Sequence, residues 1–129
     1  MPSLSHLQRI PAVYERRLEH QGIFTTGLLL EVSETPTRKQ YLADQIGATP
    51  NDVDDWRDEA LLLNLARFGA VEQAIFSQAG VLGIRAVVDA PVEEFARRLD
   101  LAARTLGLPV PDELTITSWW EQAQTLEEE

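Results

Sequence analysis

The sequence predicts an all-α protein, and three observations indicate it. Glycines stand just past runs of helical periodicity, where a left-handed residue ends a helix at little cost: Gly22, Gly47, Gly80 and Gly107. Prolines stand where helices should begin, because the first turn needs no backbone donor: Pro36, Pro50 and Pro91. No segment alternates apolar and polar residues as a half-buried strand would, although the β-branched stretch 115–117 could be extended.

Such signals place each expected helix. Thr35 and Thr49 precede two of the prolines as N-caps, and Thr49 with Asp52 forms a capping box. Ala90 has no side-chain acceptor for the helix that starts at 91, so Asp89 is the expected cap there. We expect helices at residues 5–9, 12–21, 26–33, 36–46, 50–65, 71–79, 84–89, 91–106 and 117–127.

The long helix at 50–65 has one apolar stripe, formed by Val53, Trp56, Ala60 and Leu63. Its acids, Asp52, Asp55, Asp58 and Glu59, are expected to lie away from this stripe in water, where early acids suit the N-terminal end of a helix. The stretch 51–59 lacks the loop glycine and the distal glutamate of a helix-loop-helix calcium site. We interpret it as a solvated helix start, with an acidic patch for a basic partner as the alternative.

The C-terminal segment begins with a proline-rich link, at 108–116, that should be extended. Ser118 and Glu121 then form a capping box for the last helix. The adjacent Trp119 and Trp120 must point about 100° apart on that helix. We expect Trp120 to pack inward and Trp119 to meet a partner as an aromatic anchor. The alternative is that both pack intramolecularly.

A looser copy of the stretch that starts near Arg9 recurs 58 positions later. The identical residues are Leu7 with Leu65, Arg9 with Arg67, Ala12 with Ala70, Val13 with Val71 and Gly22 with Gly80. Two copies of one supersecondary unit usually share a core, because neither buries its apolar face alone. We therefore expect one compact domain over 1–129, made of a first unit at 7–47, a central connecting helix at 48–65, a second unit at 65–107, the proline-rich link, and a C-terminal helix with an acidic tail at 117–129.

These residues resemble the helix-hairpin-helix motif, in which an apolar-Pro-Gly-apolar-Gly turn joins two helices and a glycine with a β-branched residue follows. Over positions 7–126 the chain resembles a family of unknown function built from two such motifs and common in photosynthetic bacteria. The segments that carry the resemblance are LQRIPAVYERRLEHQGI, TPTRKQYLADQIG, LARFGAVEQAIFSQAGV and SWWEQAQTL, together with the helix at 51–65. The resemblance implies tandem helix-hairpin-helix repeats packed around a long central helix, and it implies no reaction.

In hairpins of this kind that bind nucleic acid, glycines let backbone N–H groups approach a phosphate. Ala12 and Tyr14 occupy those positions in the first copy, and Ala70 and Glu72 occupy them in the second. A tyrosine ring and a carboxylate both oppose a bound phosphate, so we do not expect nucleic acid as the partner. Nucleic-acid binding stays as the alternative function, and its site would be the first hairpin, at Arg9, Ala12, Arg16 and Arg17.

Composition narrows the remaining functions. The 129 residues include 44% hydrophobic ones, no cysteine and two histidines, and the net charge is −10. Residues 1–41 carry five basic and four acidic side chains, whereas 67–129 carry five basic and eleven acidic ones, and an acidic body repels nucleic acid. No apolar run approaches the roughly 20 residues that span a bilayer, and no signal pattern opens the chain. We expect a soluble cytoplasmic protein with no membrane insertion.

No motif of a nucleophile, a phosphate loop or a dinucleotide site is present, and His6 and His20 lack partners at ligand spacing. We therefore expect no enzyme activity, no cofactor and no metal. The expected function is that of a non-catalytic protein-protein interaction or assembly module, with the partner's identity and any homo-oligomer left open. The candidate partner-binding residues are Val13, Tyr14, Arg16 and Arg17 on the first hairpin and Trp119 on the last helix.

Overall fold

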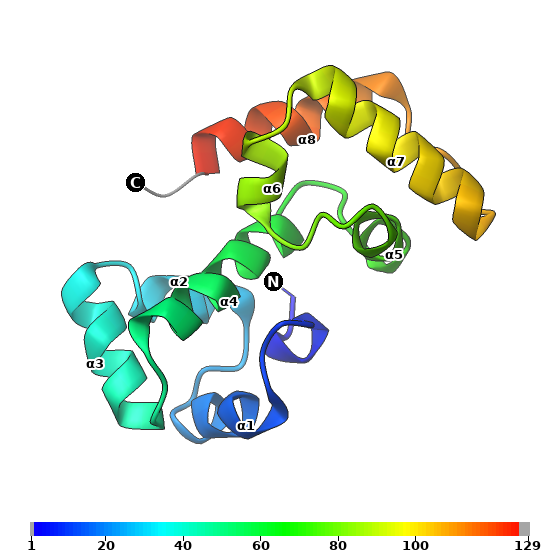
Figure 1. Cartoon of the computed structure of the whole chain (residues 1–129). Helices are drawn as coiled ribbons and strands as arrows, with labels where there is room; N and C mark the ends of the chain where they lie inside the picture. Colours follow the sequence, from blue (N-terminus) through cyan, green and yellow to red (C-terminus); the bar gives the residue numbers. More distant parts are fainter. Residues whose placement is uncertain (1, 127–129) are drawn as a thin grey trace. The chain divides into compact units, whose positions relative to one another are not determined.

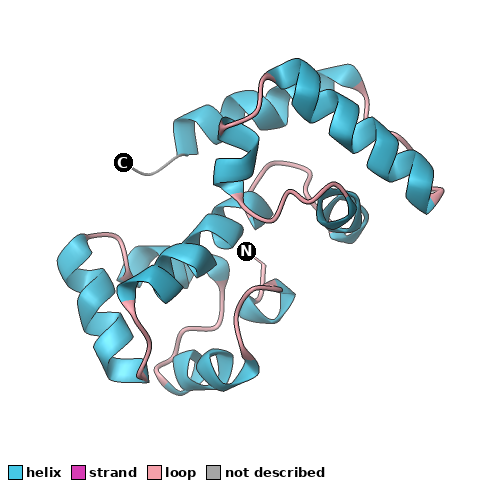
Figure 2. Cartoon of the chain, viewed as in Figure 1, coloured by secondary structure: helices cyan, strands magenta, loops and turns pink. Residues whose placement is uncertain are grey.

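The computed structural model describes residues 2–126, which form helices joined by short loops (Figure 1 and Figure 2). In chain order they are the 3-10 turn η1 (Leu4–His6) and the α-helices α1 (Ala12–His20), α2 (Thr26–Val32), α3 (Pro36–Ile46), α4 (Pro50–Leu63), α5 (Ala70–Gln78), α6 (Ile84–Val88), α7 (Val92–Leu106) and α8 (Glu113–Leu126). An isolated antiparallel bridge joins Ser3 and Thr25, and no strand forms among the described residues. The all-α prediction is confirmed.

The helix ends follow local chemistry as predicted. Thr35 accepts the backbone N–H of Arg38 at the start of α3, and Thr49 forms a complete capping box with Asp52 at the start of α4. All four glycines expected to end helices have positive φ, between 69° and 82°: Gly22, Gly47, Gly80 and Gly107. Local sequence therefore fixes where most helices begin and end.

Two predictions about helix starts are wrong in the segments before α1 and α7. The segment expected at 5–9 is only the short turn η1, capped by Ser3, and the chain after it is not helical. Asp89 does not cap α7, because Pro91 itself takes the N-cap position with extended backbone and no side chain caps the helix. Asp89 is instead the C-cap residue of α6.

The last helix also starts earlier than predicted. Asp112 accepts the backbone N–H of Thr115 at 2.7 Å, which caps α8 so that it begins at Glu113. Ser118 then lies inside the helix, so the predicted capping box of Ser118 with Glu121 is wrong. The β-branched stretch 115–117 is helical for the same reason.

The contacts of the chain divide it into two compact units, the first ending at Asn64 and the second beginning at Leu65. In the first unit α4 packs on α2 and α3, and α1 packs on α3. In the second unit α8 packs on α6 and α7, and α5 packs on α7. Helix α4, for which we expected a connecting role, thus packs as the last helix of the first unit. Within the described residues each unit contains four α-helices in the same order, and the three packing pairs named for the first unit recur in the second.

The last helices of the two units match in a second register, at a shift of 63 residues. It places Val53, Trp56, Ala60 and Leu63 of α4 on Ile116, Trp119, Ala123 and Leu126 of α8. All of these side chains are buried except that of Leu126, which is half-buried. The capping contacts obey the same register, since Thr49 with Asp52 corresponds to Asp112 with Thr115. The repeated segment is therefore the whole four-helix unit and extends beyond its first hairpin.

Each unit buries its own aromatic core. In the first unit the Trp56 ring is buried and lies 5.4 Å from the ring of Tyr14. In the second unit Phe76 contacts Phe95 and Trp119 edge to face, with ring centroids 5.7 Å and 5.3 Å apart. Edge-to-face packing suits the ring quadrupoles, so these aromatic residues anchor the last helix in each unit.

Candidate functional site

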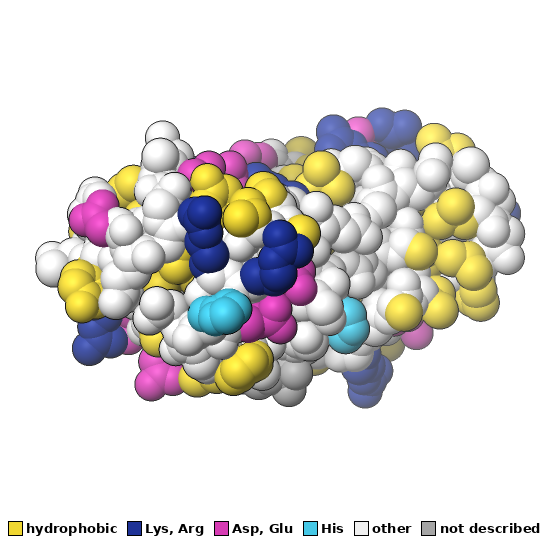
Figure 3. Space-filling model, turned by 90° about the horizontal axis from the view of Figure 1, so that it is seen from below, with side chains coloured by type: hydrophobic (Ala, Val, Ile, Leu, Met, Phe, Trp, Pro, Cys, Tyr) yellow, Lys and Arg dark blue, Asp and Glu magenta, His cyan; other side chains and the backbone are white. Residues whose placement is uncertain are grey.

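The four candidate residues of the first hairpin all lie on α1. Val13 is 39% exposed, and Arg16 is exposed and lines a shallow cavity of about 330 Å³ with Glu19 and His20. Figure 3 shows the face that carries α1, where basic, acidic and apolar side chains are intermixed. Val13 and Arg16 are thus available to a partner.

The other two candidates on α1 are engaged within the first unit. Tyr14 is half-buried, and its ring stacks at a tilt on Trp56. The Arg17 guanidinium lies 5.7 Å from the Tyr14 ring and donates a 2.7 Å hydrogen bond to the carbonyl of Ile46, at the C-terminal end of α3. A cation at a helix C-terminus satisfies its last carbonyls. Tyr14 therefore packs α1 against α4, and Arg17 fastens α1 to the end of α3.

The backbone N–H groups that lead into the first hairpin already have acceptors. The carboxylate of Glu59 accepts the N–H of Gln8 at 2.7 Å and the N–H of Arg9 at 2.9 Å. Glu59 is only 4% exposed, so the prediction that it lies in water is wrong. It is held inward because its oxygens accept two backbone N–H groups in this partly buried turn.

Arg9, a candidate for phosphate binding, is neutralised inside the unit. Its two terminal nitrogens lie 3.1 Å from Asp55 and 2.8 Å from Asp58 on α4. Ala12 is exposed at the start of α1 and carries no polar side chain. Of the basic candidates, Arg16 is therefore the one without a described partner on another helix of its unit.

The second hairpin also satisfies its own turn. Glu72 accepts the N–H of Gly69 at 2.8 Å, so a carboxylate already occupies the start of α5. The N–H of Ala66 is accepted by the carboxamide of Gln122 on α8 at 3.1 Å. This last contact is the counterpart of the contact between Gln8 and Glu59, because Ala66 corresponds to Gln8 at the shift of 58 and Gln122 corresponds to Glu59 at the shift of 63.

The orientation predicted for the two C-terminal tryptophans is wrong. Trp119 is 2% exposed, and its indole N–H donates to the carbonyl of Ala66 at 2.8 Å. Trp120 is half-buried and donates to the carbonyl of Ala90 at 2.8 Å. Trp119 shares its helix face with Ile116 and Ala123, at spacings of three and four residues, so it faces the core. It is not a surface anchor, and the alternative in which both rings pack within the chain holds.

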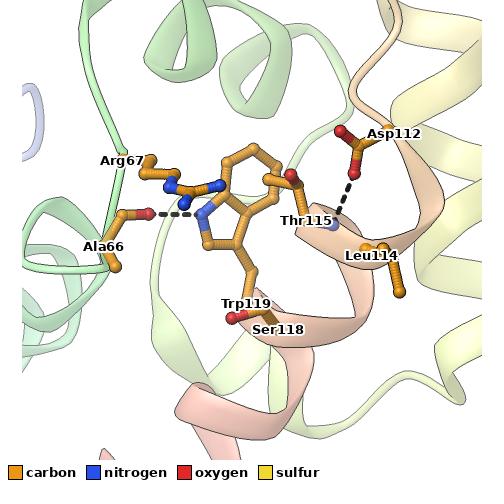
Figure 4. Close-up of a pocket in the computed structure, with 7 residues that line it drawn as sticks. All are labelled: Ala66, Arg67, Asp112, Leu114, Thr115, Ser118 and Trp119. Carbon is orange, nitrogen blue, oxygen red and sulfur yellow. Dashed lines mark hydrogen bonds between the residues drawn. The ribbon is translucent and has the colours of Figure 1, made fainter.

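An open cleft of about 350 Å³ lies beside Trp119 in the second unit (Figure 4). Arg67 extends from the loop before α5 beside the Trp119 indole toward Thr115 of α8, and Ser118 lines the cleft beyond the indole. Hydrogen bonds from Thr115 lower the pKa of Asp112 at the edge of this cleft, with a smaller contribution from the positive charge of Arg67. This cleft was not predicted from the sequence, because the residues that line it come from two segments about 50 residues apart.

Matching positions in the two units also expose apolar side chains. At a shift of 58, Val13 corresponds to Val71 and Phe24 to Leu82. The third helix of each unit matches at a shift of 60, which relates Gly47 to Gly107 and Tyr41 to Leu101. These six side chains are between 39% and 65% exposed. Only Val13 was a candidate, although the repeat at 58 could have indicated Val71 as well.

Two further properties bear on the kind of site that this chain offers. Within residues 2–126, no group of three or more His, Asp or Glu side chains is arranged to hold a metal ion. The helices of that region are too short or too polar for any of them to cross a bilayer.

The comparisons with known proteins agree with the sequence analysis on the family. No curated protein and no solved structure matches the chain. Residues 8–126 match a family described as a domain of unknown function (DUF4332). This match covers both units and the link between α7 and α8. The chain therefore belongs to this family of domains of unknown function.

Proposed function

We propose that this chain is a non-catalytic module that binds another protein or assembles with it. The observation that carries the proposal is the repetition of exposed apolar positions in the two units. Scattered apolar residues on a surface need no explanation, but three exposed pairs at matching positions indicate a surface that each unit presents. Apolar and aromatic side chains of this kind are the usual centres of protein interfaces.

The surface of α1 suits a protein partner in charge as well. Arg16 stands beside Glu19 and His20, so a partner meets both signs of charge near the apolar Val13. Tyr14 holds α1 on α4 and Arg17 holds it on α3, which limits the conformational entropy that binding would cost. Val13 and Arg16 are therefore the residues of the first hairpin that we assign to the partner.

The turn contacts argue against nucleic acid as the partner. A phosphate would have to displace the carboxylate of Glu59 from two N–H groups, or that of Glu72 from one. It would also approach a protein of net charge −10, and phosphate contacts supply most of nucleic-acid affinity. The alternative through Arg9 would further require breaking its ion pairs with α4.

The experiment compares two sets of surface variants in affinity capture followed by direct binding. Val13→Asp with Val71→Asp removes one matched pair, and Phe24→Asp with Leu82→Asp removes another. Val110→Asp is the control, because Val110 is 39% exposed but its counterpart at the shift of 60 is Pro50, which is not among the exposed apolar residues. Proteins lost from the capture with both pairs and kept with the control are then purified and titrated against the chain.

We expect each double substitution to weaken binding of the purified partner by tenfold or more, since an anchor in an interface contributes about 2 kcal/mol. Size-exclusion chromatography with light scattering shows whether the partner is a second copy of the chain. Equal binding by the double variants and the control would contradict the proposal. Tight, steeply salt-dependent binding of duplex or single-stranded probes, lost in Arg16→Glu, would replace it with the nucleic-acid function.

A further inference from the structure

The cleft beside Arg67 lies where the first unit has an ion pair. The shift of 58 places Arg67 on Arg9, and the shift of 63 places Ser118 on Asp55. A contact common to both units fixes this comparison: the residue before each arginine donates its N–H to a side chain of the last helix, from Gln8 to Glu59 and from Ala66 to Gln122. Each arginine therefore follows a residue that contacts the last helix of its unit, although the backbone φ is positive at Arg67 and not at Arg9.

The carboxylates that surround Arg9 are mostly missing around Arg67. In the first unit Asp55, Asp58 and Glu59 all contact the arginine, through its guanidinium or its backbone N–H. Their counterparts in the second unit are Ser118, Glu121 and Gln122, two of which are neutral. Glu121 is exposed, and within residues 2–126 Arg67 has no ion pair.

The space left by these side chains is open and lined with hydrogen-bonding groups. The cleft of about 350 Å³ is lined by Arg67, Thr115 and Ser118, and the Trp119 indole lies between Arg67 and Ser118 (Figure 4). The Ser118 hydroxyl accepts a 2.9 Å hydrogen bond from the carboxamide of Gln122, which leaves its own proton to donate. A guanidinium and a hydroxyl donor match an anionic ligand, and the carboxylate of Asp112, which also lines the cleft, accepts the backbone N–H of Thr115.

The backbone of Arg67 adds an independent indication. Its φ is +62°, and it is the one non-glycine among the described residues with positive φ. A glycine would adopt this conformation without strain, whereas an arginine side chain there costs free energy. Such strain is commonly found at binding sites, where the side chain must point in a set direction.

Asp112 decides what kind of anion fits. Its carboxylate stands at the edge of the cleft and is ionised, because the bonds from Thr115 lower its pKa. It repels a phosphate dianion more strongly than a singly charged carboxylate. A carboxylate also reproduces the group that Asp55 places beside Arg9 in the first unit.

We propose that this cleft binds a carboxylate from another molecule, with the Arg67 guanidinium as its ion-pair partner and the Ser118 hydroxyl as a second donor. The carboxylate comes either from an acidic side chain of a polypeptide or from a free organic acid, and the same two donors recognise both. The site lies wholly in the second unit and does not depend on the protein-binding surface proposed above.

Nuclear magnetic resonance titration of the whole chain tests the proposal. The probes are succinate, a blocked peptide with a single aspartate, the same peptide with asparagine, and inorganic phosphate, each at constant ionic strength. The indole N–H of Trp119 reports directly, because it donates to the residue before Arg67. We expect a saturable shift of this resonance with succinate, with the aspartate peptide, or with both; a response to the peptide alone assigns the carboxylate to a polypeptide.

Three variants show whether the named donors are responsible. Arg67→Gly removes the guanidinium at a position where glycine is unstrained, and it should weaken binding about tenfold to a hundredfold, the range of charge-assisted hydrogen bonds. Ser118→Asp supplies the carboxylate from within the chain and should block the external one. Arg104→Ala is the control, because Arg104 pairs with Asp100 on α7 and does not line the cleft. No shift with either carboxylate probe, a response to phosphate alone, or undiminished binding by Arg67→Gly would overturn the proposal.

Discussion

Replacing Glu59 by alanine should destabilise the first unit by about 2–4 kcal/mol. The Glu59 carboxylate accepts two backbone hydrogen bonds, of 2.7 Å from Gln8 and 2.9 Å from Arg9, and its side chain is 4% exposed. A hydrogen bond to a charged group contributes roughly 1.5–3 kcal/mol, and removing the acceptor leaves two donors without partners. The two losses share one side chain and so add only in part.

Glu59→Gln is the matched control, and the second unit shows how it would act. There Gln122 accepts one turn N–H with its carboxamide oxygen and donates to Ser118, four residues earlier. In the first unit a glutamine at 59 has Asp55 at the corresponding position to receive its N–H₂ group. One of the two turn bonds is then kept, so we expect Glu59→Gln to cost about 1–2 kcal/mol, clearly less than alanine.

Amide hydrogen exchange followed by nuclear magnetic resonance separates these effects residue by residue. Protection of the N–H groups of Gln8 and Arg9 should fall most in Glu59→Ala, and the slowest amides of α4 should lose protection by the full destabilisation. Amides of the second unit serve as the internal reference, because Glu59 makes its described contacts in the first unit. If Glu59→Gln proved as destabilising as Glu59→Ala, or if neither changed exchange by more than about 0.5 kcal/mol, the acceptor role assigned to Glu59 would be wrong.

Three further predictions concern helix ends. Gly47→Ala should lower the free energy of unfolding by about 1–2 kcal/mol because its φ is +73°, and by a further amount because the new Cβ would lie 2.9 Å from Nη1 of Arg17. Gly22→Ala has a similar φ but open space around the new Cβ, so it should cost only the backbone strain. Urea unfolding measures both variants. Thr49→Ala removes the cap of α4 and should cost about 1 kcal/mol in the same assay. The pKa of Asp112 is lowered in the folded chain, so the unfolded chain binds this proton more readily. The contribution of Asp112 to stability is therefore present above the ordinary pKa of aspartate and is lost as pH falls through the lowered folded pKa. Asp112→Asn should flatten that part of the curve of melting temperature against pH.

Local chemistry is what the sequence encodes most legibly in this chain. Thr35 and Thr49 cap helices because each has a hydroxyl one residue before a proline that begins a helix. Gly47 and Gly107 end α3 and α7 because a positive φ there costs glycine nothing. These signals need only a few neighbouring residues, so the helix boundaries that depend on them could be predicted.

The errors at the C-terminal helix come from using a single register for the repeat. At a shift of 58, residues 116–126 have no counterpart with the same pattern, and Trp120 is as good an inward residue as Trp119. At a shift of 63, Trp119 falls on the buried Trp56 and Asp112 falls on the cap Thr49. The segments between the matching helices differ in length by a few residues, and a comparison of the two halves that allows such gaps would have found both registers.

No local sequence pattern predicts that the Glu59 side chain is a buried acceptor of hydrogen bonds. Its position three residues after Trp56 and four before Leu63 places it near the edge of the apolar stripe, where a carboxylate normally meets water. Its hydrogen-bond partners are about 50 residues earlier in the chain. A buried carboxylate is stable there only because tertiary structure brings two backbone donors to it, and tertiary contacts of this kind cannot be deduced from spacing.

The comparison of the two units shows which part of each turn is required by the fold. The N–H of Gln8 and the N–H of Ala66 both need an acceptor from the last helix of their unit, and an ionised Glu59 serves in one case and a neutral Gln122 in the other. The fold therefore requires an oxygen atom at this position and does not require its charge. The charge at this position is thus free to differ between the two units, as it does between Glu59 and Gln122. We therefore propose that a carboxylate from outside pairs with this guanidinium of Arg67, which is kept at a strained backbone position beside a cleft where the counterparts of Asp55 and Glu59 are neutral.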